Sequence, residues 1–159
     1  MATHTETALF FRLALRVGLA TPADVERWIA VVLDTEEVIP HPVAELAGSS
    51  RLPRATVDEL LGEFTGPVKQ FLPGHLVMAL VARRLRAGEI TPRDATTIGR
   101  AVGGVGDLPE REYYDLDRFD DGLQLAATGT YGDGDTISAE VRAYCERYSP
   151  CATDLPPTL

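Results

Sequence analysis

The chain has 159 residues, of which 45% are hydrophobic and 25% are charged, and its formal net charge at neutral pH is −9. This composition is typical of a globular protein with its own hydrophobic core, and it excludes an intrinsically disordered chain. No stretch approaches the roughly 18 consecutive apolar residues of a membrane-spanning helix. Arg12 and Arg16 interrupt the apolar N-terminal stretch, which argues against a secretion signal. We therefore expect a single domain covering residues 1–159, cytoplasmic and without a membrane partner.

The negative charge is unevenly distributed along the sequence. Residues 103–159 carry 12 acidic and 4 basic side chains, whereas residues 1–102 are nearly neutral. Such a field repels nucleic acid and favours a protein partner with a basic surface. Solubility is the alternative explanation, because acidic surfaces also keep proteins in solution.

Helical spacing of apolar residues recurs along the first half of the chain. A first helix ends at Gly18, and its apolar face consists of Leu9, Phe10, Leu13 and Val17. A second helix begins at Pro22, and its apolar face consists of Val25, Trp28, Ile29, Val32 and Leu33. Pro40, His41 and Pro42 predict a surface turn before a short helix over 43–47. Thr56 and Glu59 then form a capping-box pattern that predicts the start of a further helix, with Val57, Leu60, Leu61 and Phe64 inward.

The second half predicts a similar set of helices. The first ends at Gly88, with Leu76, Val77, Leu80, Val81 and Leu85 inward. The next runs over 92–102 and is expected to end at the glycine run 103–106. Pro109 predicts the start of another helix, with Tyr113, Leu116 and Leu123 inward. A glycine-rich turn over 128–135 precedes a last amphipathic helix with Ile137, Val141, Tyr144, Cys145 and Tyr148 inward, and we expect residues 149–159 to be a loose tail.

One ten-residue pattern, L-R-x-G-x-x-T-P-x-D, occurs at residues 15–24 and again at 85–94. Glycine suits the left-handed residue that ends a helix. Threonine caps the following helix, proline fits its first position, and the aspartate complements its positive N-terminus. The pattern predicts an all-α, single-domain helical bundle built from two related helical-hairpin units, residues 8–68 and 72–148, packed face to face.

No pattern indicates catalytic, cofactor-binding or metal-ligating residues. The glycine run 103–106 lacks the Lys-Ser/Thr of a phosphate loop. The three histidines and two cysteines lack zinc-site spacing, and we expect Cys145 to be a buried hydrophobe. The acidic segments near Asp117 and Asp133 fail the register of a calcium-binding EF-hand. The sequence therefore predicts no cofactor and favours a role other than catalysis, although it leaves the question of an enzyme open.

The acidic segment is interleaved with tyrosines, a combination that suits a protein interface. We predict that its surface binds the partner, through Glu110, Glu112, Tyr114, Asp115, Asp117, Asp120, Asp121, Tyr131, Asp133 and Asp135. A helix-turn-helix fits the basic second corner poorly, since Asp94 would fall on its buried site. We expect the arginines of this second corner to pair with acidic side chains of residues 103–159, the acidic third of the chain, or to flank a groove between the units. They are Arg83, Arg84, Arg86, Arg93 and Arg100.

The segment Gly18–Trp28, followed by an acidic loop and Pro40–Leu46, resembles small helical bacterial proteins of uncharacterised function, some of which are immunity proteins of interbacterial toxin systems. The resemblance implies a protein-binding module that neutralises a basic toxin or enzyme by covering it. Two alternatives remain at this point. One is a small-molecule or metal-binding helical enzyme with a site at the junction of the two units. The other is a structural or scaffold helical module.

Overall fold

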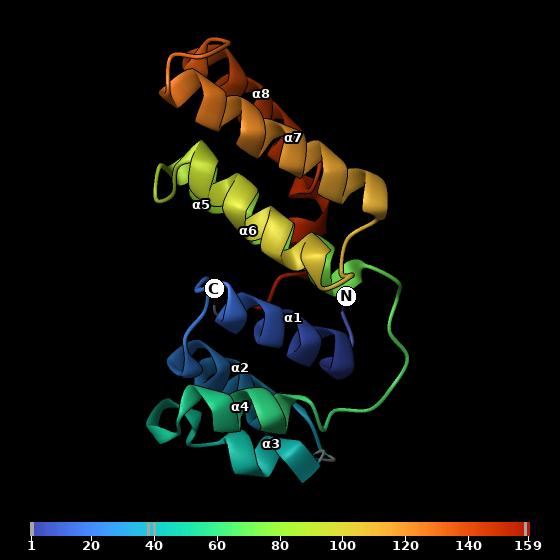
Figure 1. Ribbon diagram of the computed structural model, residues 1–159. Coiled ribbons are helices and arrows are strands. Elements are labelled where there is room, and N and C mark those ends of the chain that lie inside the picture. Colours follow the sequence, from blue (N-terminus) through green and yellow to red (C-terminus); the bar gives the residue numbers. More distant parts are fainter. Residues whose placement is uncertain (1, 38, 40, 158) are drawn as a thin grey trace. The chain divides into compact units, whose positions relative to one another are not determined.

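The computed structural model describes residues 2–37, 39, 41–157 and 159, and the chain is all-helical, without a strand in these ranges (Figure 1). None of the helices in the described part is long and apolar enough to span a membrane. The chain divides into two compact units, residues 1–69 with 154–159 and residues 70–153. The predictions of one shared domain and of an internal repeat stay predictions, and each unit is described by itself.

The first unit contains four α-helices and one short 3-10 helix among its described residues. These are α1 (His4–Arg16), α2 (Pro22–Thr35), α3 (His41–Leu46), η1 (Ser49–Arg51) and α4 (Arg54–Leu61). Trp28 of α2 lies at the centre of an aromatic cluster, with ring centroids 5.4 Å from Phe11 and 5.6 Å from Phe64. Burial of these rings joins α1, α2 and the segment after α4 into one apolar core.

The second unit contains α5 (Leu72–Ala87), α6 (Pro92–Gly104), α7 (Glu110–Ala127) and α8 (Gly134–Glu146), and the 3-10 helix η2 (Ser149–Asp154) begins in it. Helix α5 is apolar all round over residues 76–82, each of which is at most 2% exposed. A helix with apolar residues on every side lies in the core of its protein. Helices α6 and α8 contact α5, and α7 packs along both of them (Figure 1).

Both repeated corners have the predicted local structure. Gly18 and Gly88 have φ of 75° and 74°, in the left-handed region where glycine is favoured. Each of the following helices begins at the proline, and the preceding threonine forms a capping box with the aspartate three residues later. The all-α prediction and both corner predictions are therefore confirmed.

Two predicted features of the first unit are wrong and one lies outside the described residues. Helix α4 begins at Arg54, so Thr56 lies inside it and does not cap it. The reason is Pro53: the residue before it, Leu52, is extended, as residues before proline usually are, and the helix starts directly after the proline. Leu33 is 37% exposed, because it lies past the buried stripe of α2. The predicted turn at Pro40 falls on a residue outside the described ranges, and His41 already begins α3.

Two predictions for the second half are also corrected. Helix α6 continues through Gly103 and Gly104, because Gly103 lies against Tyr113 and packing offsets the low helix propensity of glycine. The predicted loose tail begins instead with η2, and Leu155 after it is only 9% exposed. Burial of this leucine gives the segment an apolar contact that its polar and proline-rich sequence did not reveal.

Candidate functional site

Helix α7 carries most of the predicted binding residues and packs closely on α6. A Cβ atom added at Gly99 would lie 2.6 Å from Cδ1 of Leu116, so a larger residue there would force the Leu116 side chain to shift. Leu116 is fully buried and Phe119 is 7% exposed. These contacts fix which side of α7 faces inward, and therefore which of its acidic side chains can reach a partner.

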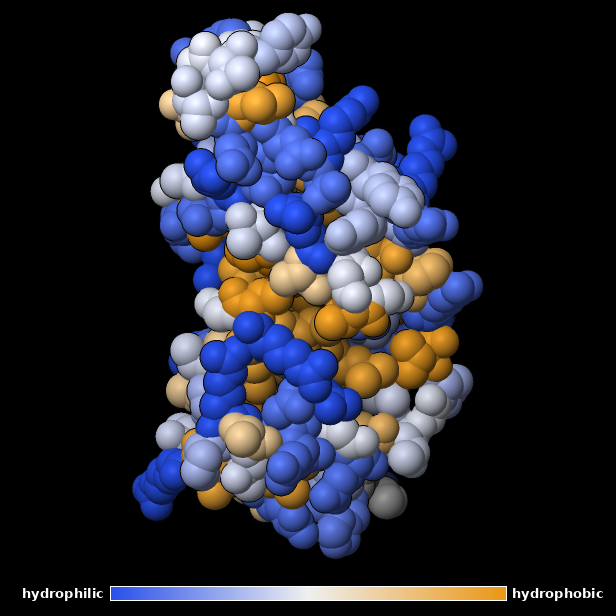
Figure 2. Space-filling view, in the orientation of Figure 1, coloured by the Kyte–Doolittle hydropathy of each residue, from blue (hydrophilic) through white to orange (hydrophobic). Residues whose placement is uncertain are grey.

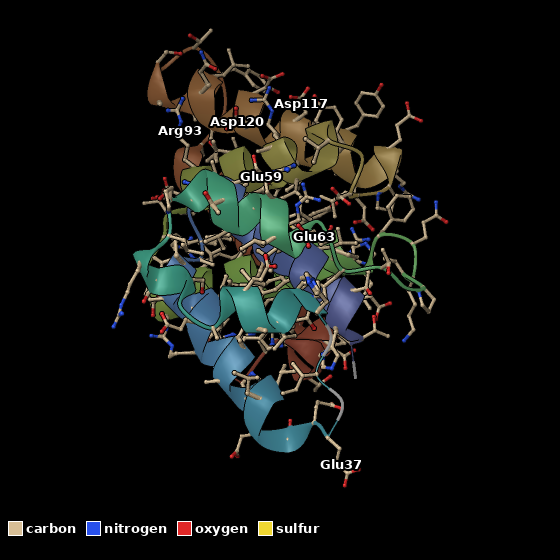
Figure 3. All side chains as sticks on the ribbon, turned by 90° about the horizontal axis from the view of Figure 1, so that it is seen from below. Glu37, Glu59, Glu63, Arg93, Asp117 and Asp120 are labelled. Atoms are coloured by element: carbon tan, nitrogen blue, oxygen red, sulfur yellow. The ribbon has the colours of Figure 1, made fainter. Side chains whose placement is uncertain are left out.

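Two of the predicted binding residues pair with an arginine of their own unit. Nε of Arg100 lies 2.7 Å from Oδ1 of Asp117, and its Nη1 lies 2.6 Å from Oδ2 of Asp120. Asp120 is only 8% exposed and also accepts a hydrogen bond from the hydroxyl of Thr96. Figure 3 shows both aspartates on α7. Asp120 therefore stabilises the packing of α6 on α7 and is not displayed at the surface.

Glu112 is likewise engaged inside the unit. Its Oε2 lies 3.2 Å from Nε2 of His75 and accepts a hydrogen bond of 2.7 Å from the hydroxyl of Tyr148. Burial, together with this hydrogen bond to Glu112, raises the pKa of Tyr148. The cluster joins the start of α5, the start of α7 and the segment after α8. His75 lies in the first turn of its helix.

Asp133 and Asp135 belong to the start of α8. Asp133 is its N-cap and accepts hydrogen bonds from the backbone N–H of Asp135 and Thr136, which lower the pKa of Asp133 together with a bond from the Thr136 hydroxyl. Asp135 is exposed and, like Arg93 of α6, lines an open depression of about 380 Å³. The capping role of Asp133 accounts for its position without a partner.

The exposed residues of α7 form a stripe. Tyr114, Arg118, Asp121 and Leu125 follow each other at intervals of four, three and four residues, which places them on one side of a helix. We call these four residues the α7 stripe. Tyr114 is 59% exposed and Leu125 is 42% exposed. Leu125 was not predicted from the sequence, although its distance of eleven residues from Tyr114 is the signal that could have identified it.

A surface depression lies at the C-terminal end of the α7 stripe. An open depression of about 350 Å³ is lined by Asp121, Gln124, Leu125 and Thr128. The backbone N–H of Tyr131 donates to the carbonyl of Leu125 at 3.4 Å, and the side chain of Tyr131 is 79% exposed. In the space-filling view the surface over α7 is mostly hydrophilic, with a small apolar patch towards its end (Figure 2). A carboxylate and an apolar side chain therefore line one depression, a pair that can take a long cationic side chain.

The two units of the folded chain carry similar net charges, although the sequence concentrates its negative charge in residues 103–159. The arginines between residues 83 and 100 lie in the same unit as residues 103–153, which hold most of the acidic third, and Arg86 and Arg100 pair with acidic residues of that segment, as predicted. The second unit therefore has a net charge of −4 and the first a net charge of −5. Within the second unit the negative charge is concentrated in residues 110–135, which hold eight acidic side chains and only two basic ones, Arg111 and Arg118.

Among the described residues no three His, Cys, Asp or Glu side chains are grouped so that they could hold a metal ion. Cys145 is fully buried, as predicted, and burial raises the pKa of its thiol to about 12. A thiol with such a pKa is not a nucleophile at neutral pH.

The function of this chain has to be inferred from the geometry of its surface, because comparisons with known proteins find no match. No family model matches the chain, and searches of curated proteins and of solved structures find no match.

Proposed function

We propose that this chain is a protein-binding module of the immunity type, which neutralises a basic toxin or enzyme by covering it. The binding surface consists of the α7 stripe together with Tyr131 and the exposed acids Glu110 and Asp135. Among the ten residues predicted from the sequence, Glu112, Asp120 and Asp133 then act inside the unit, and Asp117 pairs with Arg100. Asp115 is only partly exposed and is not included in the proposed surface.

The observation that carries this proposal is the depression at the end of α7. Asp121 has no ion pair or hydrogen bond from its side chain within the described part of the chain, and it lies beside exposed Leu125. A lysine or arginine of the partner would place its aliphatic stem on Leu125 and its charge on Asp121. Tyr131 and Tyr114 would supply aromatic anchors, which dominate the energetics of many interfaces.

The experiment has two stages. The tagged chain is first used as bait in lysate of its source organism at low and at high salt, and a basic protein retained in stoichiometric amount is purified. Association and dissociation rates are then measured for the wild type, for Asp121→Lys and for Tyr131→Ala. Asp121→Lys should slow association, most strongly at low salt, because complementary charge steers encounter. Tyr131→Ala should mainly speed dissociation.

Glu59→Lys is the matched control, since Glu59 is exposed but belongs to the first unit. It changes the net charge as much as Asp121→Lys does, and the proposal requires that it leave the association rate nearly unchanged. Equal slowing by the two variants would mean that only the total charge matters. Recovery of the bait alone at both salt concentrations would reject a tight protein partner.

A further inference from the structure

The first unit contains an open depression of about 500 Å³ that the proposed function does not use. It lies among the starts of α1 and α3 and the segment after α4. Its polar lining includes His4, His41 and Glu63, and its apolar lining includes Phe64, Pro42 and Pro67. This volume is within the range of about 300–1,000 Å³ typical of small-molecule sites, and an apolar wall with a few polar groups is their usual composition.

Internal contacts hold one wall of the depression in place. The buried carboxylate of Glu6 accepts a hydrogen bond of 2.8 Å from the backbone N–H of Lys69, just after this wall. A Cβ atom on Gly66 would lie 2.8 Å from Oγ1 of Thr5, so the segment lies directly against α1. The depression is therefore formed by tertiary contacts of the folded unit, which keeps the conformational cost of binding low.

The ring of Phe64 connects the depression to the aromatic core. Its centroid lies 5.6 Å from that of Trp28, and the ring of His4 lies 6.3 Å from the same indole. Trp28 is the single tryptophan of the chain. Because two lining residues touch this indole, it reports directly on occupancy of the depression.

The charges around the depression select the sign of a ligand. Nε2 of His4 lies 3.5 Å from Glu36, and Nε2 of His41 lies 3.8 Å from Glu45. Glu63 itself has no ion pair or side-chain hydrogen bond among the described residues. An anion would meet these carboxylates in a unit whose net charge is −5, whereas a cation would find Glu63 unneutralised.

We propose that this depression binds a small organic cation with an apolar body, such as an aromatic or aliphatic amine. The ammonium group would pair with Glu63, and the hydrocarbon would lie against Phe64 and Pro42. This site is independent of the α7 stripe, and neither proposal depends on the other.

Three probes of nearly equal shape test the proposal: benzylamine, benzyl alcohol and benzoate. Each is titrated into the ¹⁵N-labelled full chain, and the amide shifts of residues 63–66 and the indole resonance of Trp28 are followed. Benzylamine should saturate in the millimolar range, which is what so few non-hydrogen atoms can achieve. Benzyl alcohol should bind about five-fold more weakly, and benzoate should give no saturable shift.

Glu63→Gln and Glu59→Gln provide the matched pair of variants. Glu59 lies on α4 and Glu63 lies just beyond its end, and both side chains are exposed. Only Glu63 lines the depression. Figure 3 labels both residues, with Glu37 well apart from them. Glu63→Gln should weaken benzylamine about five-fold and leave benzyl alcohol unchanged, while Glu59→Gln should change neither. Circular dichroism verifies that each variant is folded. Equal affinity for the amine and the alcohol, tighter binding of benzoate, or no saturable response to benzylamine in the folded wild type would each overturn the proposal.

Discussion

Arg100 of α6 donates from Nη1 to Oδ2 of Asp120 on α7 at 2.6 Å. Asp120 is only 8% exposed, whereas the side chain of Arg100 as a whole is 40% exposed. The same guanidinium also reaches Asp117, so one arginine faces two carboxylates and leaves a net negative charge on this side of the helix. The pair thus stabilises the contact of α6 with α7, and it also reduces the acidic surface that the sequence suggested.

Asp120→Ala should destabilise the protein by about 2 kcal/mol, because it removes a buried acceptor from both Arg100 and the hydroxyl of Thr96. Asp117→Ala should cost less than about 1 kcal/mol, since the side chain of Asp117 is 34% exposed and water can replace its contact with Arg100. Urea unfolding followed by circular dichroism measures both values. Equal losses would show that burial does not distinguish the two pairs.

Gly103→Ala and Gly104→Ala test how closely α6 and α7 pack. A Cβ atom at Gly103 would lie 2.8 Å from Cδ2 and 2.9 Å from Cβ of Tyr113, whereas Gly104 has open space. The first substitution should destabilise by about 1–2 kcal/mol through overpacking. The second should stabilise by about 0.5 kcal/mol, because alanine restricts the unfolded chain. Thermal unfolding midpoints should therefore move in opposite directions, and a shift of the same sign for both would contradict the close packing.

Thr91→Ala tests the capping box of the second corner. The hydroxyl of Thr91 accepts from the backbone N–H of Asp94, and the Asp94 carboxylate accepts from the backbone N–H of Thr91. Loss of the hydroxyl should cost about 1 kcal/mol. Thr97→Ala, at an exposed position inside the same helix, should stay within about 0.5 kcal/mol of the wild type. If both alanines had the same effect in urea unfolding, the cap would contribute nothing.

Glu6 predicts a specific dependence of stability on pH. Burial alone would raise the pKa of Glu6, but hydrogen bonds from Thr3 and Lys69 bring it below the ordinary value. The contribution of this carboxylate to stability is therefore fully present above the unfolded-state pKa of about 4.3, and it is lost as the pH falls through the lower folded-state pKa. Glu6→Gln should lower the free energy of unfolding by about 2 kcal/mol at pH 7.

The difference in unfolding free energy between wild type and Glu6→Gln isolates this carboxylate from other acidic groups. That difference should be constant above pH 5 and shrink towards pH 3, measured by urea unfolding at each pH. A difference that stays constant down to pH 3 would mean that the ionised state of Glu6 is not what stabilises the fold.

Much of the helical structure could be predicted because its signals are local. The glycine, threonine, proline and aspartate of each corner act on atoms within a few residues, and both corners have the expected geometry. The proline before α4 is also a local signal, and it sets the start of that helix at Arg54 instead of at the predicted capping box. The predicted end of α6 failed for a different reason, because a tertiary contact decided it. The glycine run was expected to end α6, but Gly103 faces Tyr113 and the helix continues.

The candidate site was less accessible to sequence analysis. Helical periodicity identifies which residues share a side of α7, but not which side faces its neighbours. Glu112 and Asp121 look alike in the sequence, yet the first binds His75 and Tyr148 while the second lines an open depression. Leu125 went unnoticed because an apolar residue in a helix is ordinarily assigned to the core.

Composition and local pattern by themselves determined that this chain is all-helical, that two corners share one construction, and that Cys145 is buried. Only the tertiary structure decided which charges remain at the surface. Arg86 and Arg100 lie far in sequence from the carboxylates that they bind. Capping and helix propensity act through neighbouring residues, whereas the pairing of a charge depends on which helices fold against each other, and that information is absent from any short stretch of the chain.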